Sequence, residues 1–78
     1  MVKVRVFSTT TCPWCERAKQ FLKEHNIEFE DINVQENRDA LIEMVTKTGQ
    51  MGVPVIEIDG EFVIGFDERR LKELLNIR

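Results

Sequence analysis

Residues 8–19 read STTTCPWCERAK and place two cysteines, Cys12 and Cys15, three positions apart. Before them, residues 2–7 alternate apolar with charged side chains, at the period of two that is typical of a β-strand. After them, residues 13–25 repeat apolar side chains at helical spacing. The segment therefore predicts a strand, a short loop that carries Cys12, and a helix, in that order.

The predicted helix has a recognisable start, apolar face and end. Pro13 suits the first helical position, where its missing N–H leaves no hydrogen bond unmade. Asn26 can adopt the left-handed conformation that ends helices, which places the last turn near His25. The apolar face, at i, i+3 and i+7, consists of Cys15, Ala18 and Leu22. Cys15 is therefore predicted to point into the core.

A second strand and a second helix are predicted next. Residues 27–34 predict the strand, with Ile27 and Phe29 on one of its faces. Asn37 is a suitable N-cap for the helix that follows. Gly49 ends that helix, because glycine tolerates the left-handed conformation found after a last helical turn. These elements continue the alternation of strand and helix.

The last third of the chain predicts a hairpin and a helix. Residues 54–58 and 62–64 predict two strands, and Asp59-Gly60 between them is a strong signal for a two-residue hairpin turn. Asp67 can cap the final helix. Pro54 suits the start of a strand, where a missing N–H is tolerated. From the sequence alone, a trans Val53-Pro54 bond is the default, because only about 5–6% of X-Pro bonds in folded proteins are cis.

The predicted order of elements is βαβαββα within a single α/β domain, residues 1–78. Helical crossovers join parallel strands, whereas the hairpin joins antiparallel ones. We therefore expect a four-stranded mixed sheet with three helices on its two faces. The two cysteines then lie at the carboxyl end of the first strand, where the first helix begins.

Composition excludes several classes of protein. The chain has a net charge of −3 with no basic stripe, which argues against a nucleic-acid binder. No apolar run approaches the roughly 18 residues of a membrane span. Residues 1–7, MVKVRVF, lack the cleavage site of a signal peptide. We expect a cytoplasmic protein with no membrane partner.

The cysteine count favours redox chemistry over a structural metal site. A structural zinc ion takes four ligands, and this chain offers Cys12, Cys15 and His25 as its cysteine and histidine ligands. Two chains could pool their thiolates around zinc or an iron–sulfur cluster, so that alternative stays open. Two cysteines are also too few for a disulfide framework. A pair of thiols that exchanges electrons is the favoured interpretation.

The two thiols are predicted to differ in reactivity. At a helix N-terminus, free N–H groups and the helix dipole stabilise a thiolate. In CxxC motifs this lowers the cysteine pKa from about 8.5 to about 3.5–7.5. Arg17 and Lys19 add positive charge and Glu16 opposes it, but we expect these side chains to extend into solvent. Cys12 is then the exposed nucleophile and Cys15 the protected resolving thiol.

Three separated stretches resemble the glutaredoxins and small glutaredoxin-like redoxins: FSTTTCPWC, TGQMGVPVIEIDG and IGFDERRLKELL. The resemblance covers essentially the whole chain. It implies a thioredoxin fold, with Pro54 preceded by a cis bond. It also implies a thiol–disulfide oxidoreductase that acts on protein disulfides and glutathione mixed disulfides and is recycled by glutathione.

The resemblance also implies a glutathione or substrate site. In the family, the residue before the cis-proline, here Val53, binds the cysteinyl part of glutathione through its backbone. Asp67 matches the acceptor for the glutamyl ammonium. The site predicted on this basis comprises Thr9, Pro13, Trp14, Val53, Pro54, Gly65, Phe66 and Asp67.

Several positions depart from the usual glutaredoxin pattern. Thr9 stands where Lys or Arg is usual, and a neutral donor binds a carboxylate less strongly than a charged one. Trp14 replaces the common Tyr, and Gly52 stands where Thr is usual. The Gly65-Phe66 pair resembles redoxins that serve ribonucleotide reductase and are recycled by thioredoxin reductase.

These departures leave two alternatives to glutathione-linked reduction. One is a redoxin electron donor recycled by thioredoxin reductase. The other is a dimer that carries a [2Fe–2S] cluster, which the stiffening of the Cys12 loop by Pro13 disfavours. We predict a monomer with glutathione as co-substrate, without a bound metal ion or a permanently bound cofactor.

Overall fold

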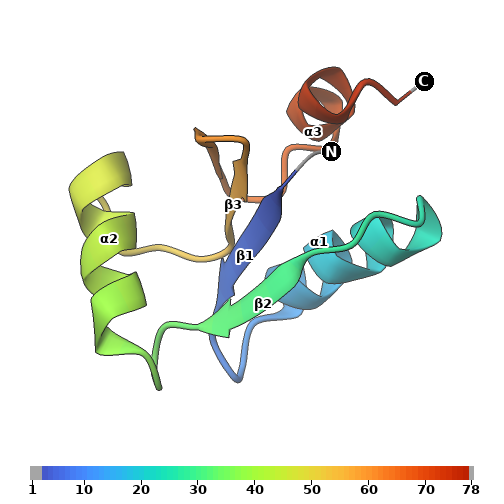
Figure 1. Cartoon of the computed structure of the whole chain (residues 1–78). Coiled ribbons are helices and arrows are strands. Elements are labelled where there is room, and N and C mark those ends of the chain that lie inside the picture. Colours follow the sequence, from blue (N-terminus) through green and yellow to red (C-terminus); the bar gives the residue numbers. More distant parts are fainter. Residues whose placement is uncertain (1–2, 78) are drawn as a thin grey trace.

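The computed structural model describes residues 3–77, and its order of elements is the predicted βαβαββα (Figure 1). Met1, Val2 and Arg78 lie outside the described residues, and so does the predicted start of the first strand at Val2. The elements are β1 (Val4–Ser8), α1 (Pro13–Glu24), β2 (Glu30–Asn33), α2 (Arg38–Thr48), β3 (Val55–Ile58), β4 (Glu61–Ile64) and α3 (Glu68–Leu75).

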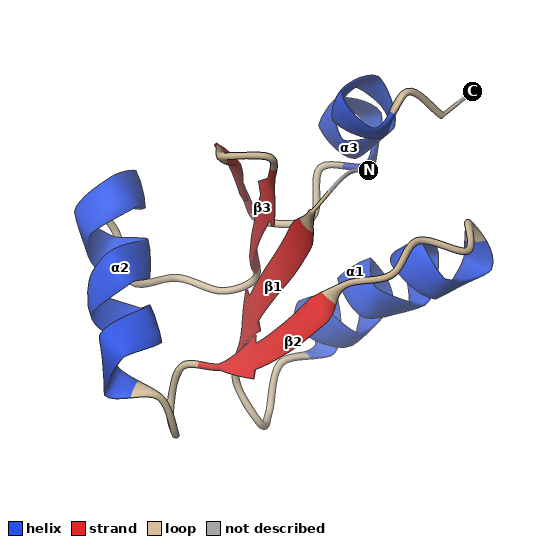
Figure 2. Cartoon of the chain, in the orientation of Figure 1, coloured by secondary structure: helices blue, strands red, loops and turns tan. Residues whose placement is uncertain are grey.

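The four strands form one mixed sheet in the order β2-β1-β3-β4. β1 runs parallel to β2 and antiparallel to β3, and β4 is antiparallel to β3. Figure 2 shows α2 on one side of this sheet and α1 and α3 on the other. The arrangement is the thioredoxin fold that the resemblance implies, with a layer of helices on each face.

Alternation along β1 builds a separate core on each face. Val4 and Val6 join a cluster with side chains of α1 and α3, including Leu22 and Leu71. Phe7 lies on the opposite face, in a second cluster contributed largely by β2 and α2. Complete burial of one such side chain stabilises the fold by about 1.5–3 kcal/mol. β1 is therefore held from both sides, and its carboxyl end is a stable platform for the cysteine loop.

The predicted starts of the three helices and the predicted ends of α1 and α2 are confirmed, whereas α3 ends at Asn76, for which the sequence made no prediction. The side chains of Cys12, Asn37 and Asp67 each accept a hydrogen bond from the backbone N–H three residues on. Gly49 ends α2 at a φ of 72°, and Asn26 follows α1 at a φ of 57°. A good N-cap contributes about 1 kcal/mol. Local chemistry alone therefore defines where α1 starts, and so where Cys12 lies.

The predicted second strand is wrong at its start, because β2 begins at Glu30 and not at Ile27. The Ile27 N–H donates to the Leu22 carbonyl at 2.9 Å, a bond that closes the end of α1. Ile27 and Phe29 still pack against the core of α1 and α3, as loop residues. Their apolar alternation reflects burial beside a helix end instead of pairing in a sheet.

The hairpin between β3 and β4 has the predicted turn. Asp59 and Gly60 both have positive φ, 48° and 90°, as a tight two-residue turn requires. β3 begins at Val55, one residue after the predicted start at Pro54. Over residues 3–77, none of the helices is long and apolar enough to cross a membrane.

Candidate active site

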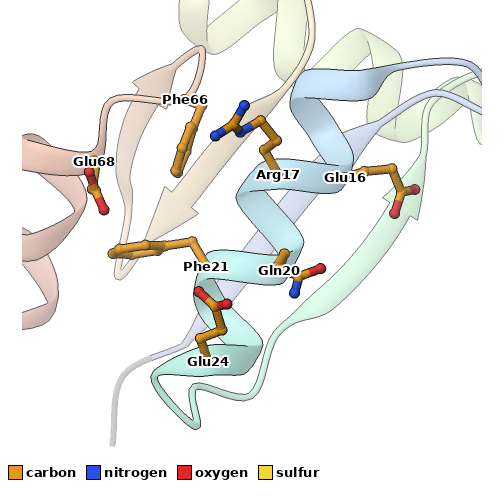
Figure 3. A pocket seen from close by; sticks show the side chains of 7 residues that line it. All are labelled: Glu16, Arg17, Gln20, Phe21, Glu24, Phe66 and Glu68. Carbon is orange, nitrogen blue, oxygen red and sulfur yellow. The ribbon is translucent and has the colours of Figure 1, made fainter.

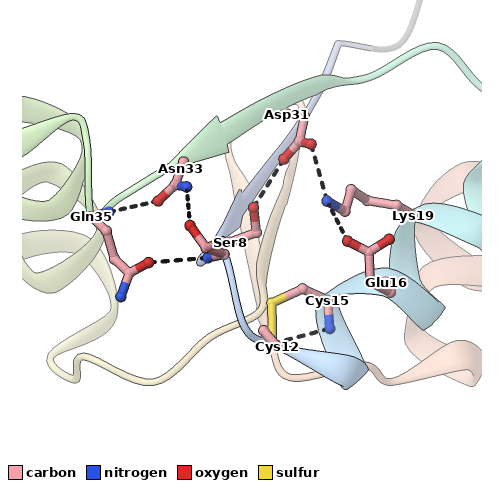
Figure 4. Close-up of polar contacts among 9 residues, drawn as sticks. Ser8, Cys12, Cys15, Glu16, Lys19, Asp31, Asn33 and Gln35 are labelled. Carbon is pink, nitrogen blue, oxygen red and sulfur yellow. Dashed lines mark hydrogen bonds and ion pairs between the residues drawn. A yellow bond between two sulfur atoms is a disulfide. The ribbon is translucent and has the colours of Figure 1, made fainter.

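Cys12 and Cys15 form a disulfide at the N-terminus of α1 (Figure 4). Their Cα atoms lie 5.2 Å apart, within the usual range for a disulfide. The sulfur of Cys12 accepts a hydrogen bond from the Cys15 N–H at 3.1 Å, so Cys12 is also the N-cap of the helix. The structure therefore shows the oxidised form of the pair, with one sulfur already bonded to a free amide of the first turn.

The two sulfurs differ in burial, as predicted. Cys15 is fully buried, with 0% of its surface exposed. Cys12 is half-buried, so its side chain is only partly open to solvent and not fully exposed. A molecule approaching from outside therefore meets Cys12 and does not reach Cys15.

A chain of polar contacts beside the cysteines joins β1, β2 and α1 (Figure 4). Ser8 Oγ donates to Asp31 Oδ1 at 2.9 Å, and Lys19 Nζ donates to Asp31 Oδ2 at 3.0 Å. Lys19 also pairs with Glu16 at 3.1 Å. Burial opposes the charge of Lys19, but its hydrogen bonds to Asp31 and Glu16 raise its pKa above the usual value.

For Lys19, these contacts correct the prediction that the charged side chains near the cysteines extend into solvent, whereas Glu16 and Arg17 are exposed as predicted. The side chain of Lys19 is only 13% exposed, because Asp31 holds it against the sheet. The guanidinium of Arg17 lies 5.5 Å from the centre of the Trp14 ring. Glu16 opposes a thiolate less than its charge alone suggests, since Lys19 compensates it.

The loop before Cys12 is anchored by two residues that the sequence did not single out (Figure 4). Gln35 Oε1 accepts the Thr10 N–H at 3.0 Å, and Asn33 Nδ2 donates to Thr10 Oγ1 at 3.0 Å. The Gln35 N–H in turn donates to Asn33 Oδ1 at 2.9 Å. No periodicity signals these contacts, because they join Thr10 to residues that lie 23 and 25 positions further along the chain.

A cavity of about 280 Å³ brings together five of the predicted site residues from three separate segments. Its lining consists of Trp14, Val53, Pro54, Gly65 and Phe66. The Val53-Pro54 bond is cis, as the resemblance implies. The Gly65 N–H donates to the Pro54 carbonyl at 2.8 Å, which joins the last two segments.

Aromatic packing fixes one wall of this cavity. Trp14 is 57% exposed and lies next to Phe66, with ring centres 6.4 Å apart. Phe66 also packs edge-on against Phe21, with ring centres 5.7 Å apart. Phe66 thus lines the cavity and also packs, partly buried, against the core.

The other three predicted residues, Thr9, Pro13 and Asp67, do not line the cavity. Thr9 is half-buried in the loop before Cys12, and Pro13 is the exposed first residue of α1. Asp67 is exposed, follows Phe66 directly, and accepts the Arg70 N–H at 3.1 Å.

A larger groove of about 430 Å³ lies along α1 (Figure 3). Neither cysteine lines this groove or the cavity beside Trp14, and the two share Phe66. Its lining is mostly charged: Glu16, Arg17, Gln20, Phe21, Glu24, Phe66 and Glu68. We place the candidate active site at the smaller cavity, because Trp14, which lies between the two cysteines in the sequence, meets the cis-proline segment there.

Possible metal ligands do not cluster in the part of the chain that the structure describes. Over residues 3–77, no group of three or more His, Cys, Asp or Glu side chains could hold an ion.

Comparison with known proteins identifies the family. The glutaredoxin family model matches residues 4–63. An uncharacterised glutaredoxin-like 8.6 kDa protein from Clostridium pasteurianum is 42% identical over 72 residues, which cover 92% of this chain and 96% of that protein. Glutaredoxin 3 of Escherichia coli is 32% identical over 68 residues, covering 87% and 82%. The glutaredoxin-like protein NrdH of Lactococcus lactis is 35% identical over 71 residues, covering 91% and 97%.

A solved structure agrees with these sequence relationships. The crystal structure of a glutaredoxin from Archaeoglobus fulgidus superposes with a TM-score of 0.84 at 31% identity, covering 96% of this chain and 87% of that one. The family, the fold and the cysteine pair together describe a thiol–disulfide oxidoreductase. This chain belongs to the glutaredoxin family.

Proposed function

We propose that this protein reduces protein disulfides and glutathione mixed disulfides through Cys12 and Cys15, and that glutathione restores its dithiol form. The observation that supports this most is the unequal burial of the pair at one helix N-terminus. The sulfur of Cys12 is reachable and bonded to an amide, whereas Cys15 is 0% exposed. The Cys12 thiol can therefore react with a substrate first, and the buried Cys15 thiol can resolve the mixed disulfide afterwards.

The reaction consumes two thiols and makes one disulfide. The Cys12 thiolate attacks one sulfur of a substrate disulfide, forming a mixed disulfide, and the other substrate sulfur leaves as a thiolate that takes a proton from water. Cys15 loses its proton to solvent and attacks the Cys12 sulfur, which releases the second substrate thiolate. The two electrons come from the dithiol, which ends as the Cys12–Cys15 disulfide seen in the structure.

In the cavity beside Trp14, the backbone of Val53 offers hydrogen-bonding groups to a substrate. The N–H and carbonyl of Val53 have no hydrogen-bond partner among residues 3–77. Both groups are therefore available to an extended peptide or to the cysteinyl part of glutathione. Trp14 and Phe66 supply apolar contacts around it. Thr9, Pro13 and Asp67, which do not line the cavity, are assigned to the wider glutathione site on the family resemblance alone.

Three specific observations favour a second candidate, a redoxin recycled by thioredoxin reductase. Thr9 has no charge to pair with a glutathione carboxylate, and a hydrogen bond to a charged donor contributes about 1.5–3 kcal/mol against about 1 kcal/mol for a neutral one. The likeness to NrdH and the Gly65-Phe66 pair point the same way.

The two candidates differ in what reduces the Cys12–Cys15 disulfide. The oxidised protein is offered glutathione with glutathione reductase in one assay and thioredoxin reductase in another, and NADPH consumption is followed in both. Fast turnover with glutathione supports the first candidate. Turnover with thioredoxin reductase alone rejects it in favour of the second.

Substitution of each cysteine tests the assigned roles. We predict that Cys12→Ser abolishes all turnover, because no thiolate then reaches the substrate. Cys15→Ser should retain the reduction of glutathione mixed disulfides, which a second glutathione can complete, and lose the dithiol reduction of protein disulfides. The opposite pattern would mean that the nucleophile is Cys15.

A further inference from the structure

The side chain of Gln50 binds both backbone groups of Gly52. Gln50 Oε1 accepts the Gly52 N–H at 2.6 Å, and Gln50 Nε2 donates to the Gly52 carbonyl at 3.1 Å. A carboxamide offers one acceptor and two donors, so a single side chain can satisfy both groups at once. The Gly52 peptide units therefore have one preferred orientation, although the loop lies outside any helix or strand.

Thr48 ties this arrangement to the end of α2. Thr48 Oγ1 lies 3.1 Å from the Gln50 carbonyl and donates to the Met44 carbonyl at 2.7 Å, within the last turn of the helix. Gln50 Nε2 also approaches Thr48 Oγ1 at 3.4 Å. The loop that leads to Val53 is thus connected to α2 through side chains as well as through the backbone.

Gly52 must be glycine for Gln50 to lie where it does. A Cβ atom at position 52 would be only 2.7 Å from Gln50 Oε1, well inside van der Waals contact. The φ of Gly52 is not in the left-handed region, so space and not backbone conformation excludes a side chain there. Gln50 and Gly52 therefore form one unit, and a larger residue at 52 has to displace the amide of Gln50.

We propose that Gln50 is a positioning residue for substrate, which holds the Gly52 peptide so that the N–H and carbonyl of Val53 face the cavity beside Trp14. This inference rests on the proposed function, in which the Val53 backbone binds the substrate. Gln50 lies one residue away from the peptide it orients and does not line the cavity. It acts on substrate affinity through Gly52, and not on the sulfur chemistry.

Kinetics on a glutathionylated peptide test this role. We expect Gln50→Ala to raise KM for the peptide about 5-fold or more while kcat changes less than about 2-fold. Gln50→Glu keeps the acceptor and loses the donors, so its KM should fall between those of the wild type and Gln50→Ala. Met51→Ala is the matched control, because Met51 lies between the two partners and is 68% exposed. It should match the wild type.

A double-mutant cycle separates positioning from general damage. Gly52→Thr should raise KM in the wild-type background, where it displaces the amide, and add little in the Gln50→Ala background, where no amide remains. Additive effects, or an unchanged KM in Gln50→Ala, would overturn the inference. A wild-type protein that fails to reduce the peptide at all would instead reject the proposed function, so the two failures are distinguishable.

Discussion

Cys12 and Cys15 differ because a helix begins between them. Cys12 is the N-cap, and its sulfur meets a free amide and the positive end of the α1 dipole. Cys15 lies one turn further, on the face that packs against the sheet, where burial disfavours a thiolate. Two identical side chains therefore acquire different chemistry from one turn of backbone.

Titration of the reduced protein tests this difference. In a Cys15→Ser variant, ultraviolet absorbance of the Cys12 thiolate should give a pKa within about 3.5–7.5, against about 8.5 in denaturant. Since the folded pKa is then the lower one, Cys12 stabilises the reduced fold above about pH 8.5, and this contribution disappears as the pH falls through the folded value. A folded pKa equal to that in denaturant would contradict the role of the helix end.

At the scale of elements, Arg5 joins β1 to two neighbours. Its guanidinium donates to both carboxylate oxygens of Glu43 on α2, at 3.1 and 2.6 Å, and to Glu57 on β3. It also lies 5.1 Å from the centre of the Phe7 ring. The hydrogen bonds to Glu43 and Glu57 raise the pKa of Arg5, and the bond from Arg5 lowers the pKa of Glu43.

Removal of this guanidinium should loosen α2 from the sheet. We predict that Arg5→Met lowers the free energy of unfolding at pH 7 by about 1–2 kcal/mol, a value reduced for the partial exposure of Glu43. Lys3→Met, which removes the same charge from an exposed neighbour, should change it by less than about 0.5 kcal/mol. Urea unfolding measures both, and equal losses would mean that only net charge matters.

The same contact makes stability depend on pH. The folded pKa of Glu43 is depressed, so its contribution is present above the unfolded value of about 4.3 and is lost as the pH falls further. The wild type should therefore lose stability more steeply than Arg5→Met below about pH 4.5.

Local signals predicted most elements, and tertiary contacts account for the errors. The caps at Asn37 and Asp67 depend on residues within one turn, which a sequence displays directly. The false start of β2 arose because the Ile27 N–H is already bonded to α1. The position of Lys19 depends on Asp31, which comes from another element and shares no pattern with it.

In the candidate site too, some residues could be predicted from local sequence signals and others could not. The cysteines and the Val53-Pro54 pair are visible as motifs, since their residue types are unusual and their spacing is fixed. The contacts of Gln50 and Gln35 are not visible, because a glutamine that binds a loop backbone follows no period.

At the scale of the whole molecule, the two hydrophobic cores that support the candidate active site lie on opposite faces of the sheet. The helix of the cysteines packs on the core that contains Leu22 and Leu71. Val53 packs instead against the second core, which contains Phe7 and Met44 on the face covered by α2. The proposed nucleophile and the proposed binding edge therefore depend on cores that lie on different faces of the sheet.

In the second core, the stability lost on truncating a side chain should depend on how deeply that side chain is buried. Met44 is fully buried on α2, whereas Ile42 on the same helix is 55% exposed. Truncation of a buried Met to Ala costs about 2–5 kcal/mol, a large part of the roughly 4–12 kcal/mol expected for a domain of this size. Met44→Ala should therefore unfold at much lower urea than the wild type, and Ile42→Ala should stay within about 1 kcal/mol of it.

The redox state of the cysteines should leave this difference unchanged, because Met44 belongs to the core on the other side of the sheet from α1. Distant sites that share no partner contribute additively, within about 0.5 kcal/mol. The loss caused by Met44→Ala is therefore expected to be the same in the oxidised protein and in protein kept reduced with dithiothreitol. A loss that differs by more than 1 kcal/mol between the two states would mean that the cores are coupled, and that α2 senses the disulfide through the sheet.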